Sequence, residues 1–142
     1  AVALRHQGPY HEIGKAFEQI SAIFTSRGLW PNALGMIGIY HDDPSLKPEA
    51  ELLSHAGVIV ADNVAVPDEL EEVRTAAGQV AVLHFKGPYA GLQPAYDYLF
   101  GTWLPQSGIE IADAPTYEVY LNSPAETAPA DLRTDICVPM RR

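Results

Sequence analysis

Apolar residues recur at helical spacing in two separate parts of the chain. Side chains at positions i, i+4, i+7 and i+11 line one face of an amphipathic helix. This pattern predicts helices over residues 10–26 and 89–104, with the second stripe 79 residues after the first. The two stripes are Ile13, Phe17, Ile20 and Phe24, and then Leu92, Tyr96, Leu99 and Trp103.

The segments that flank the two predicted helices also correspond. Each helix is preceded by Gly-Pro-Tyr, and proline is favoured at a helix start. Gly28 and Gly108 follow the helices, as expected of residues that end them. Short helical turns are predicted over residues 48–53 and 129–132. Strands are predicted over residues 2–6, 36–40 and 56–61 in the first half, and over 79–85, 116–121 and 136–140 in the second.

The correspondence indicates an internal duplication, because four blocks match at shifts of 79 or 80 residues. The predicted fold is α+β: two tandem strand-helix-strand-strand units related by a pseudo-twofold axis, with antiparallel sheet and two main helices. Repeat one covers about 1–61 and repeat two about 79–142. The connector, residues 62–78, holds an acidic segment that is expected to be exposed, and a short strand is expected over residues 73–75. Because no flexible linker is evident, we expect one domain over 1–142.

Composition restricts the function classes. The chain has 142 residues, 47% of them hydrophobic, and a net charge of −9. Its scattered basic residues predict no direct contact with nucleic acid. With no apolar run of about 20 residues, no membrane contact is expected. The single Cys137 excludes an internal disulfide and, in an apolar strand, is expected to be buried.

Neither a metal nor a cofactor is predicted. The five histidines show no recognised ligand spacing, and no glycine-rich phosphate loop is present. A reducing, cytoplasmic compartment fits the cysteine usage. Since the chain opens on Ala1 directly before a predicted strand, we expect that a preceding segment has been removed.

The two repeats differ most at Gly38 and Glu118, which are equivalent positions on the second strands. Because side chains alternate along a strand, Met36 and Tyr40 share a face with Gly38, and Tyr120 shares one with Glu118. A buried carboxylate needs a compensating partner, and a cationic ligand beside aromatic rings could provide one. The alternative is a solvent-facing glutamate on an edge strand.

Four segments resemble the GyrI-like family: residues 5–10, 38–44, 84–89 and 117–122. This family includes effector-binding domains of AraC-type transcription regulators, stand-alone gyrase-inhibitor proteins and the drug-binding domain of a MerR-type regulator. The resemblance covers almost the whole chain. It implies a central hydrophobic groove and lipophilic, often cationic, aromatic ligands. We assign no catalytic residue.

The resemblance also implies ligand-binding positions. The acidic residue of the family falls on Glu118. The aromatic positions carry over to Tyr40, Tyr120 and Tyr89, followed by Phe85 and Met36, with Gly38 leaving space opposite Glu118. His55 departs from the pattern, because the family often has an acidic residue there. Trp103 has two interpretations, core packing like Phe24 or pocket lining, and core packing is favoured.

Three functions remain open. The first is a sensor of lipophilic cations, most simply the C-terminal effector-binding domain of an AraC-type regulator whose DNA-binding domain precedes this chain. The second is a stand-alone gyrase-inhibitor-like protein that acts on a partner enzyme. The third is a hydrolase that opens electrophilic rings, with Glu118 as a general base.

Overall fold

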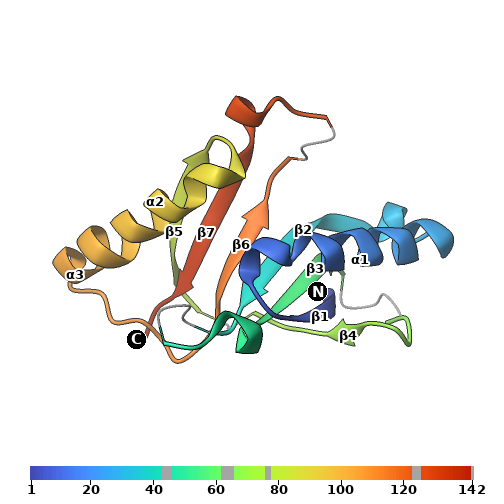
Figure 1. Cartoon of the computed structure of the whole chain (residues 1–142), viewed down its shortest axis with the longest axis horizontal. Coiled ribbons are helices and arrows are strands. Elements are labelled where there is room, and N and C mark those ends of the chain that lie inside the picture. The colour runs from blue at the N-terminus through green and yellow to red at the C-terminus, as the bar shows by residue number, and fades with distance from the viewer. Residues whose placement is uncertain (43–45, 62–65, 76–77, 123–125, 142) are drawn as a thin grey trace. The chain divides into compact units, whose positions relative to one another are not determined.

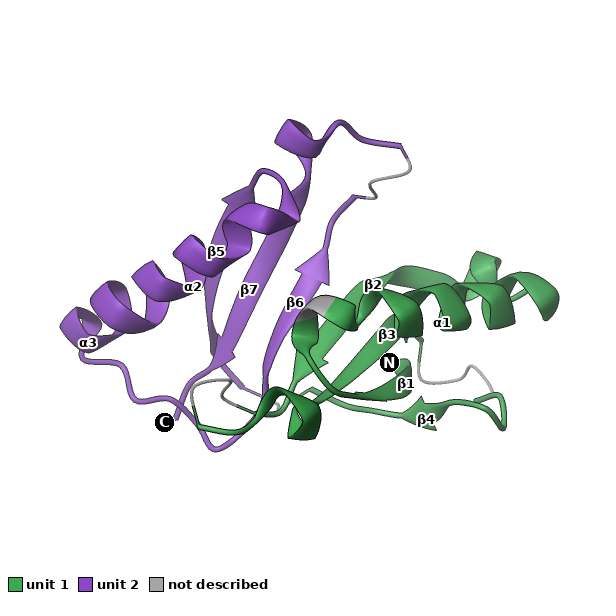
Figure 2. Cartoon of the chain, viewed as in Figure 1, with its two compact units in different colours: residues 1–75 green, residues 76–142 purple. Residues whose placement is uncertain are grey.

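A computed structural model describes the chain except for residues 43–45, 62–65, 76–77, 123–125 and 142. The chain divides into two units, Ala1–Thr75 and Ala76–Arg142 (Figure 2). Parts of the predicted connector, residues 62–65 and 76–77, lie outside the described residues. Each unit is described by itself below.

Unit 1 is an antiparallel sheet covered by one main helix (Figure 1). The strand order is β4-β1-β3-β2, and α1 packs against β1 and β3. Its elements are β1 (Val2–Gln7), the 3-10 turn η1 (Tyr10–Glu12), α1 (Gly14–Ser26), η2 (Trp30–Asn32), β2 (Ala33–Tyr40), η3 (Glu49–Glu51), β3 (Leu53–Val60) and β4 (Glu71–Glu72).

Unit 2 repeats the strand-helix-strand-strand order, and its strands are antiparallel, with β7 between β5 and β6. Its elements are β5 (Val80–Lys86), η4 (Tyr89–Gly91), α2 (Leu92–Tyr98), the π-helix η5 (Leu99–Trp103), α3 (Leu104–Ser107), β6 (Thr116–Tyr120), η6 (Pro129–Asp131) and β7 (Arg133–Pro139). The helical elements α2, η5 and α3 follow one another without a break. The predicted α+β duplication of strand-helix-strand-strand units is therefore confirmed.

The short strand of the connector forms earlier than predicted. We expected it over residues 73–75, but it forms at β4, where Glu71 pairs with Ala3 and Glu72 with Val2. The glutamate side chains are exposed, as expected of the acidic segment, whereas Leu70 is buried against the core of unit 1. Burial of Leu70 explains the position of the strand, since the side chain brings the following residues onto the edge of β1.

The cores of the two units are built from equivalent residues, but the shift between equivalent positions changes from 79 to 80 within the helix. In unit 1 the core contains Val2, Ile20, Phe24 and Val58, and in unit 2 it contains Ala81, Leu99, Leu104 and Val138. The pairs Val2/Ala81 and Ile20/Leu99 are 79 residues apart, and Phe24/Leu104 and Val58/Val138 are 80 apart. One residue has therefore been gained between Leu99 and Leu104.

The π-helix η5 accommodates the extra residue. A π-helix takes one more residue per turn than an α-helix at the same place, so it absorbs an insertion without breaking the helix. As a result Leu104, not Trp103, occupies the position of Phe24. The prediction that Trp103 packs in the core was wrong, because its side chain is 37% exposed.

The predicted helix ends are confirmed at both glycines. Gly28 has φ +65° and Gly108 has φ +75°, left-handed conformations that glycine adopts without a Cβ penalty.

Among the described residues, none of the helices has both the length and the apolar character that a membrane crossing requires.

Candidate functional site

Glu118 lies at the centre of β6, with Ile136 of β7 as its register partner. Its side chain is 5% exposed, so the alternative of a solvent-facing glutamate does not hold. The equivalent residue on β2 of unit 1 is Gly38, which is also buried and pairs with Ala56. The duplication has therefore placed a buried carboxylic acid in only one of two otherwise similar strands.

Two tyrosines donate hydrogen bonds to the carboxylate of Glu118. The hydroxyl of Tyr120, on the same face of β6, lies 2.7 Å from Oε1. The hydroxyl of Tyr96, from α2, lies 2.5 Å from Oε2. Hydrogen bonds to an ionised acceptor are short and strong, and they favour the charged form of the acid. This arrangement can hold a negative charge in a mostly apolar site.

Aromatic rings continue from the carboxylate toward the start of the helix. The rings of Tyr89 and Tyr120 meet edge to face at 5.7 Å between centroids. Burial, with the negative charge of Glu118 as the second cause, raises the pKa of Tyr89 above its ordinary value. Tyr89 therefore stays protonated at neutral pH and offers a neutral ring.

Phe85 follows on β5 and packs closely against the backbone at the helix start. It pairs with Thr134 of β7, which also pairs with Tyr120 of β6, so these three residues form one row across the sheet. A Cβ atom added at Gly91 would lie only 3.0 Å from the ring of Phe85. The absence of a side chain at Gly91 thus leaves room for the ring.

Unit 1 has the corresponding tyrosine pair without the acid. The rings of Tyr10 and Tyr40 meet edge to face at 4.9 Å. The Tyr10 hydroxyl bonds to the backbone after β2 and at the start of β3: it accepts from the Asp42 amide at 2.9 Å and donates to the Leu53 carbonyl at 3.1 Å. Met36 packs against the core of unit 1.

The predicted site residues therefore divide between the two units. Met36, Gly38 and Tyr40 lie in unit 1. Phe85, Tyr89, Glu118 and Tyr120 lie in unit 2, where the last three are linked by a hydrogen bond and a ring contact. Their role in binding stays a prediction.

Sequence reasoning missed Tyr96, which was predicted only as a member of the apolar stripe. Its equivalent in repeat one is Phe17, which differs from tyrosine by the hydroxyl alone. A comparison of the two stripes would have shown that the hydroxyl and the carboxylate both occur only in repeat two. Such a paired gain is expected when one group binds the other.

A buried hydroxyl lies beneath each tyrosine pair. Ser54 and Thr134 are equivalent residues, each fully buried, and neither hydroxyl has a hydrogen-bond partner within the described protein. Thr134 pairs directly with Tyr120, and Ser54 with Tyr40. A buried hydroxyl without a partner is destabilising.

Replacing Thr134 with valine is therefore expected to stabilise the protein by about 1 kcal/mol, since the shape is kept and the unpaired hydroxyl is removed. Urea unfolding followed by circular dichroism measures the change. As a matched control, Thr116→Val removes a hydroxyl from a partly exposed position on β6 and is expected to change stability by less than about 0.5 kcal/mol. A loss of stability in Thr134→Val would show that the hydroxyl has a bound partner.

Cys137 is buried on β7, as predicted. Burial is the main cause that raises the pKa of its thiol to about 11, and Asp135 adds to the effect. The thiol is therefore protonated at neutral pH, which excludes a reactive thiolate.

Among the described residues, no group of three or more His, Cys, Asp or Glu side chains is arranged to hold a metal ion.

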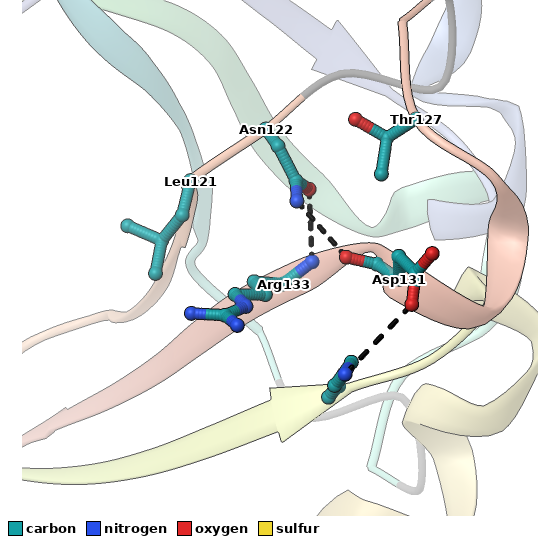
Figure 3. Close-up of a pocket in the computed structure, with 6 residues that line it drawn as sticks. Leu121, Asn122, Thr127, Asp131 and Arg133 are labelled. Carbon is teal, nitrogen blue, oxygen red and sulfur yellow. Dashed lines mark hydrogen bonds and ion pairs between the residues drawn. The ribbon is translucent and has the colours of Figure 1, made fainter.

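A pocket of about 470 Å³ lies elsewhere in unit 2 (Figure 3). Several of its polar groups bond to one another. The amide of Asn122 bonds to the Asp131 carbonyl at 3.0 Å and the Arg133 amide at 2.9 Å, and Lys86 lies 3.7 Å from the Asp131 carboxylate. Leu121 and Thr127 complete the lining, so the pocket shares no residue with the Glu118 cluster.

Comparison with known proteins gives a consistent result. The family model described as GyrI-like small molecule binding domain matches residues 1–141. A DNA gyrase inhibitor of Yersinia enterocolitica is 36% identical over 126 residues, which cover 85% of this chain and 79% of that protein.

Two solved structures share the fold at low sequence identity. EcmrR in complex with DNA matches with a TM-score of 0.76 at 19% identity, over 99% of this chain and 53% of that one. SAV2435 bound to tetraphenylphosphonium matches with a TM-score of 0.69 at 12% identity, over 99% of this chain and 87% of that one. At these identities the likeness concerns the fold alone.

Proposed function

Since the chain belongs to the family of GyrI-like small-molecule-binding domains, we propose that unit 2 binds lipophilic aromatic cations at Glu118. The observation that carries this proposal is the buried carboxylate, whose two oxygens accept hydrogen bonds from Tyr96 and Tyr120. The phenols favour the ionised acid, and an ionised acid in an apolar site attracts a cation.

The surroundings of the carboxylate select the type of cation. Aromatic faces attract a positive charge, and they do so best when the cation has little hydration to lose. A cation whose charge is spread over aromatic groups meets this requirement, whereas a strongly hydrated metal ion does not. The complex of SAV2435 with tetraphenylphosphonium, a cation of this class, supports the choice.

The proposal predicts that charge, not shape, decides binding. Tetraphenylphosphonium and tetraphenylborate have nearly the same size and the same four phenyl groups but carry opposite charges. We expect the cation to bind with a dissociation constant at least about tenfold lower than the anion, because only the cation is attracted by Glu118. Isothermal titration calorimetry with both ions measures the difference.

Equal binding of the two ions would contradict the proposed function, since hydrophobic contact alone would then account for the affinity. Binding of neither ion would contradict it as well. A titration at raised salt concentration checks the mechanism. We expect the dissociation constant of the cation to change little, because salt screens a buried charge pair only weakly.

The setting proposed for this activity is transcription regulation in the cytoplasm. In EcmrR the matched region forms about half of a DNA-binding regulator. We propose that a DNA-binding domain accompanies this chain in an AraC-type regulator, and that the ligand shifts the regulator between two populations. The acidic chain would then leave DNA contact to the other domain.

Inhibition of DNA gyrase is the second candidate. It is favoured by the Yersinia enterocolitica relative, whose identity of 36% exceeds that of the solved regulators. A supercoiling assay with purified gyrase separates the candidates. Inhibition by the isolated chain supports the second one, and unchanged supercoiling at a large excess of the chain excludes it.

A further inference from the structure

We propose that His41, His55 and Glu71 of unit 1 form an acid-sensitive latch that holds β4 on the sheet. The three side chains come from different parts of the unit: the residue after β2, the middle of β3, and β4. The inference concerns unit 1 alone and does not depend on the ligand proposed for unit 2.

The three side chains form a continuous chain of hydrogen bonds. Nε2 of His41 lies 2.8 Å from Nδ1 of His55, and Nε2 of His55 lies 2.8 Å from Oε1 of Glu71. The two imidazole rings meet edge to face at 4.9 Å between centroids. His55 is 7% exposed, so water does not replace these contacts freely.

Repeat two lacks this chain. The residues equivalent to His41 and His55 are Leu121 and Asp135, and Asp135 pairs with the exposed His84 at 2.7 Å. The connector strand β4 also belongs to unit 1 alone. The fold therefore does not require these hydrogen bonds. Repeat two also shows that leucine is accepted at the position of His41 when the hydrogen bonds are absent.

Proton counting shows why acid should open the latch. The Glu71 carboxylate only accepts, so Nε2 of His55 must carry a hydrogen. With both histidines neutral, His41 donates to Nδ1 of His55. One added proton is tolerated on either ring, because one of the two facing nitrogens still accepts. A second added proton puts hydrogens on both facing nitrogens, which cannot remain at hydrogen-bond distance.

The surroundings of His41 also disfavour an added proton on its ring. Burial is the main cause that lowers the pKa of His41, and His55 lowers it further. Asp42 and Glu71 oppose the shift, and Arg5, the register partner of His55 on β1, adds to it. Lys47 partly neutralises Asp42, with which it pairs at 3.0 Å.

The sign of the pH effect follows from the lowered pKa. The unfolded chain takes up a proton at His41 near its ordinary pKa of about 6.5, before the folded chain does. The contribution of His41 to stability is therefore present above this pH and is lost as the pH falls through the lowered value. Each proton of difference changes the opening equilibrium constant by up to about tenfold per pH unit.

Hydrogen exchange at β4 tests the latch. The Val73 amide, which donates to the Ala1 carbonyl at 2.8 Å, reports on the edge that β4 covers. After correction for the intrinsic rate, we expect its protection to fall by about five- to tenfold between pH 7.5 and 5.5 in the unaltered chain, since uptake of one proton near pH 6.5 sets a ceiling of about tenfold over this range. In His41→Gln we expect a fall of less than about threefold, because the neutral amide can donate or accept at any pH.

Two further variants complete the test. His41→Leu places the residue of repeat two at this position and is expected to flatten the pH profile in the same way. His84→Asn removes an exposed histidine and is expected to keep the profile of the unaltered chain. Equal falls in the unaltered chain and in both His41 variants, or no fall in the unaltered chain, would overturn the proposal.

Discussion

Glu118→Gln is expected to weaken the binding of tetraphenylphosphonium by about 30-fold or more, which corresponds to about 2 kcal/mol. Glutamine keeps the size of the side chain and an oxygen that can accept from Tyr96 or Tyr120. It removes the negative charge, so the cation loses its attraction in a site where water screens little. Calorimetric titration of the two forms measures the loss.

A matched variant separates a local effect from the general charge of the chain. Glu110 is an exposed glutamate of unit 2, and Glu110→Gln changes the net charge by the same amount. We expect this variant to bind the cation within about twofold of the unaltered chain, since an exposed charge is well screened. Similar losses in both variants would show that the cation binds without a specific partner at Glu118.

The aromatic part of the site should contribute less than the charge. Tyr96 and Tyr120 act on the ligand through the carboxylate that they stabilise, and each supplies a single hydrogen bond to it. The remaining phenol still supports the acid when one is removed, so the carboxylate is the more sensitive position.

Most of the fold could be predicted from the sequence, because the same pattern of apolar and turn residues occurs in both repeats. The stripe from Ile13 to Phe24 and the glycines at 28 and 108 predict the helices and their ends, and the structure confirms them. The strand β4 was displaced from its predicted position because burial of Leu70 decides it. Tertiary contacts of this kind leave no periodic signal in so short a segment.

The site could be predicted only in part, for a different reason. Glu118 is identified by a difference between the repeats, which is visible at one aligned pair of positions. Tyr96 becomes visible only when two differences are considered together, Phe17 to Tyr96 and Gly38 to Glu118. Alignment of the helices at a constant shift also hid the inserted residue, because Trp103 is as apolar as Phe24 and the stripe seemed to continue.

The inserted residue can be tested by comparing Leu104→Ala with Trp103→Ala. Leu104 is 5% exposed in the core of unit 2, and its truncation is expected to cost about 2 to 4 kcal/mol of unfolding free energy. Trp103 is 37% exposed, and its truncation is expected to cost less than that of Leu104, because it leaves no enclosed cavity. Urea unfolding monitored by circular dichroism measures both.

The order of the two effects distinguishes the π-helix from an uninterrupted α-helix. If the helix kept the 79-residue shift of its first half, Trp103 would occupy the position of Phe24, which is 1% exposed. Its truncation would then remove the larger buried side chain and cost about 3 to 5 kcal/mol, more than that of Leu104. A greater loss in Leu104→Ala therefore places the gained residue between Leu99 and Leu104, where η5 widens the helix.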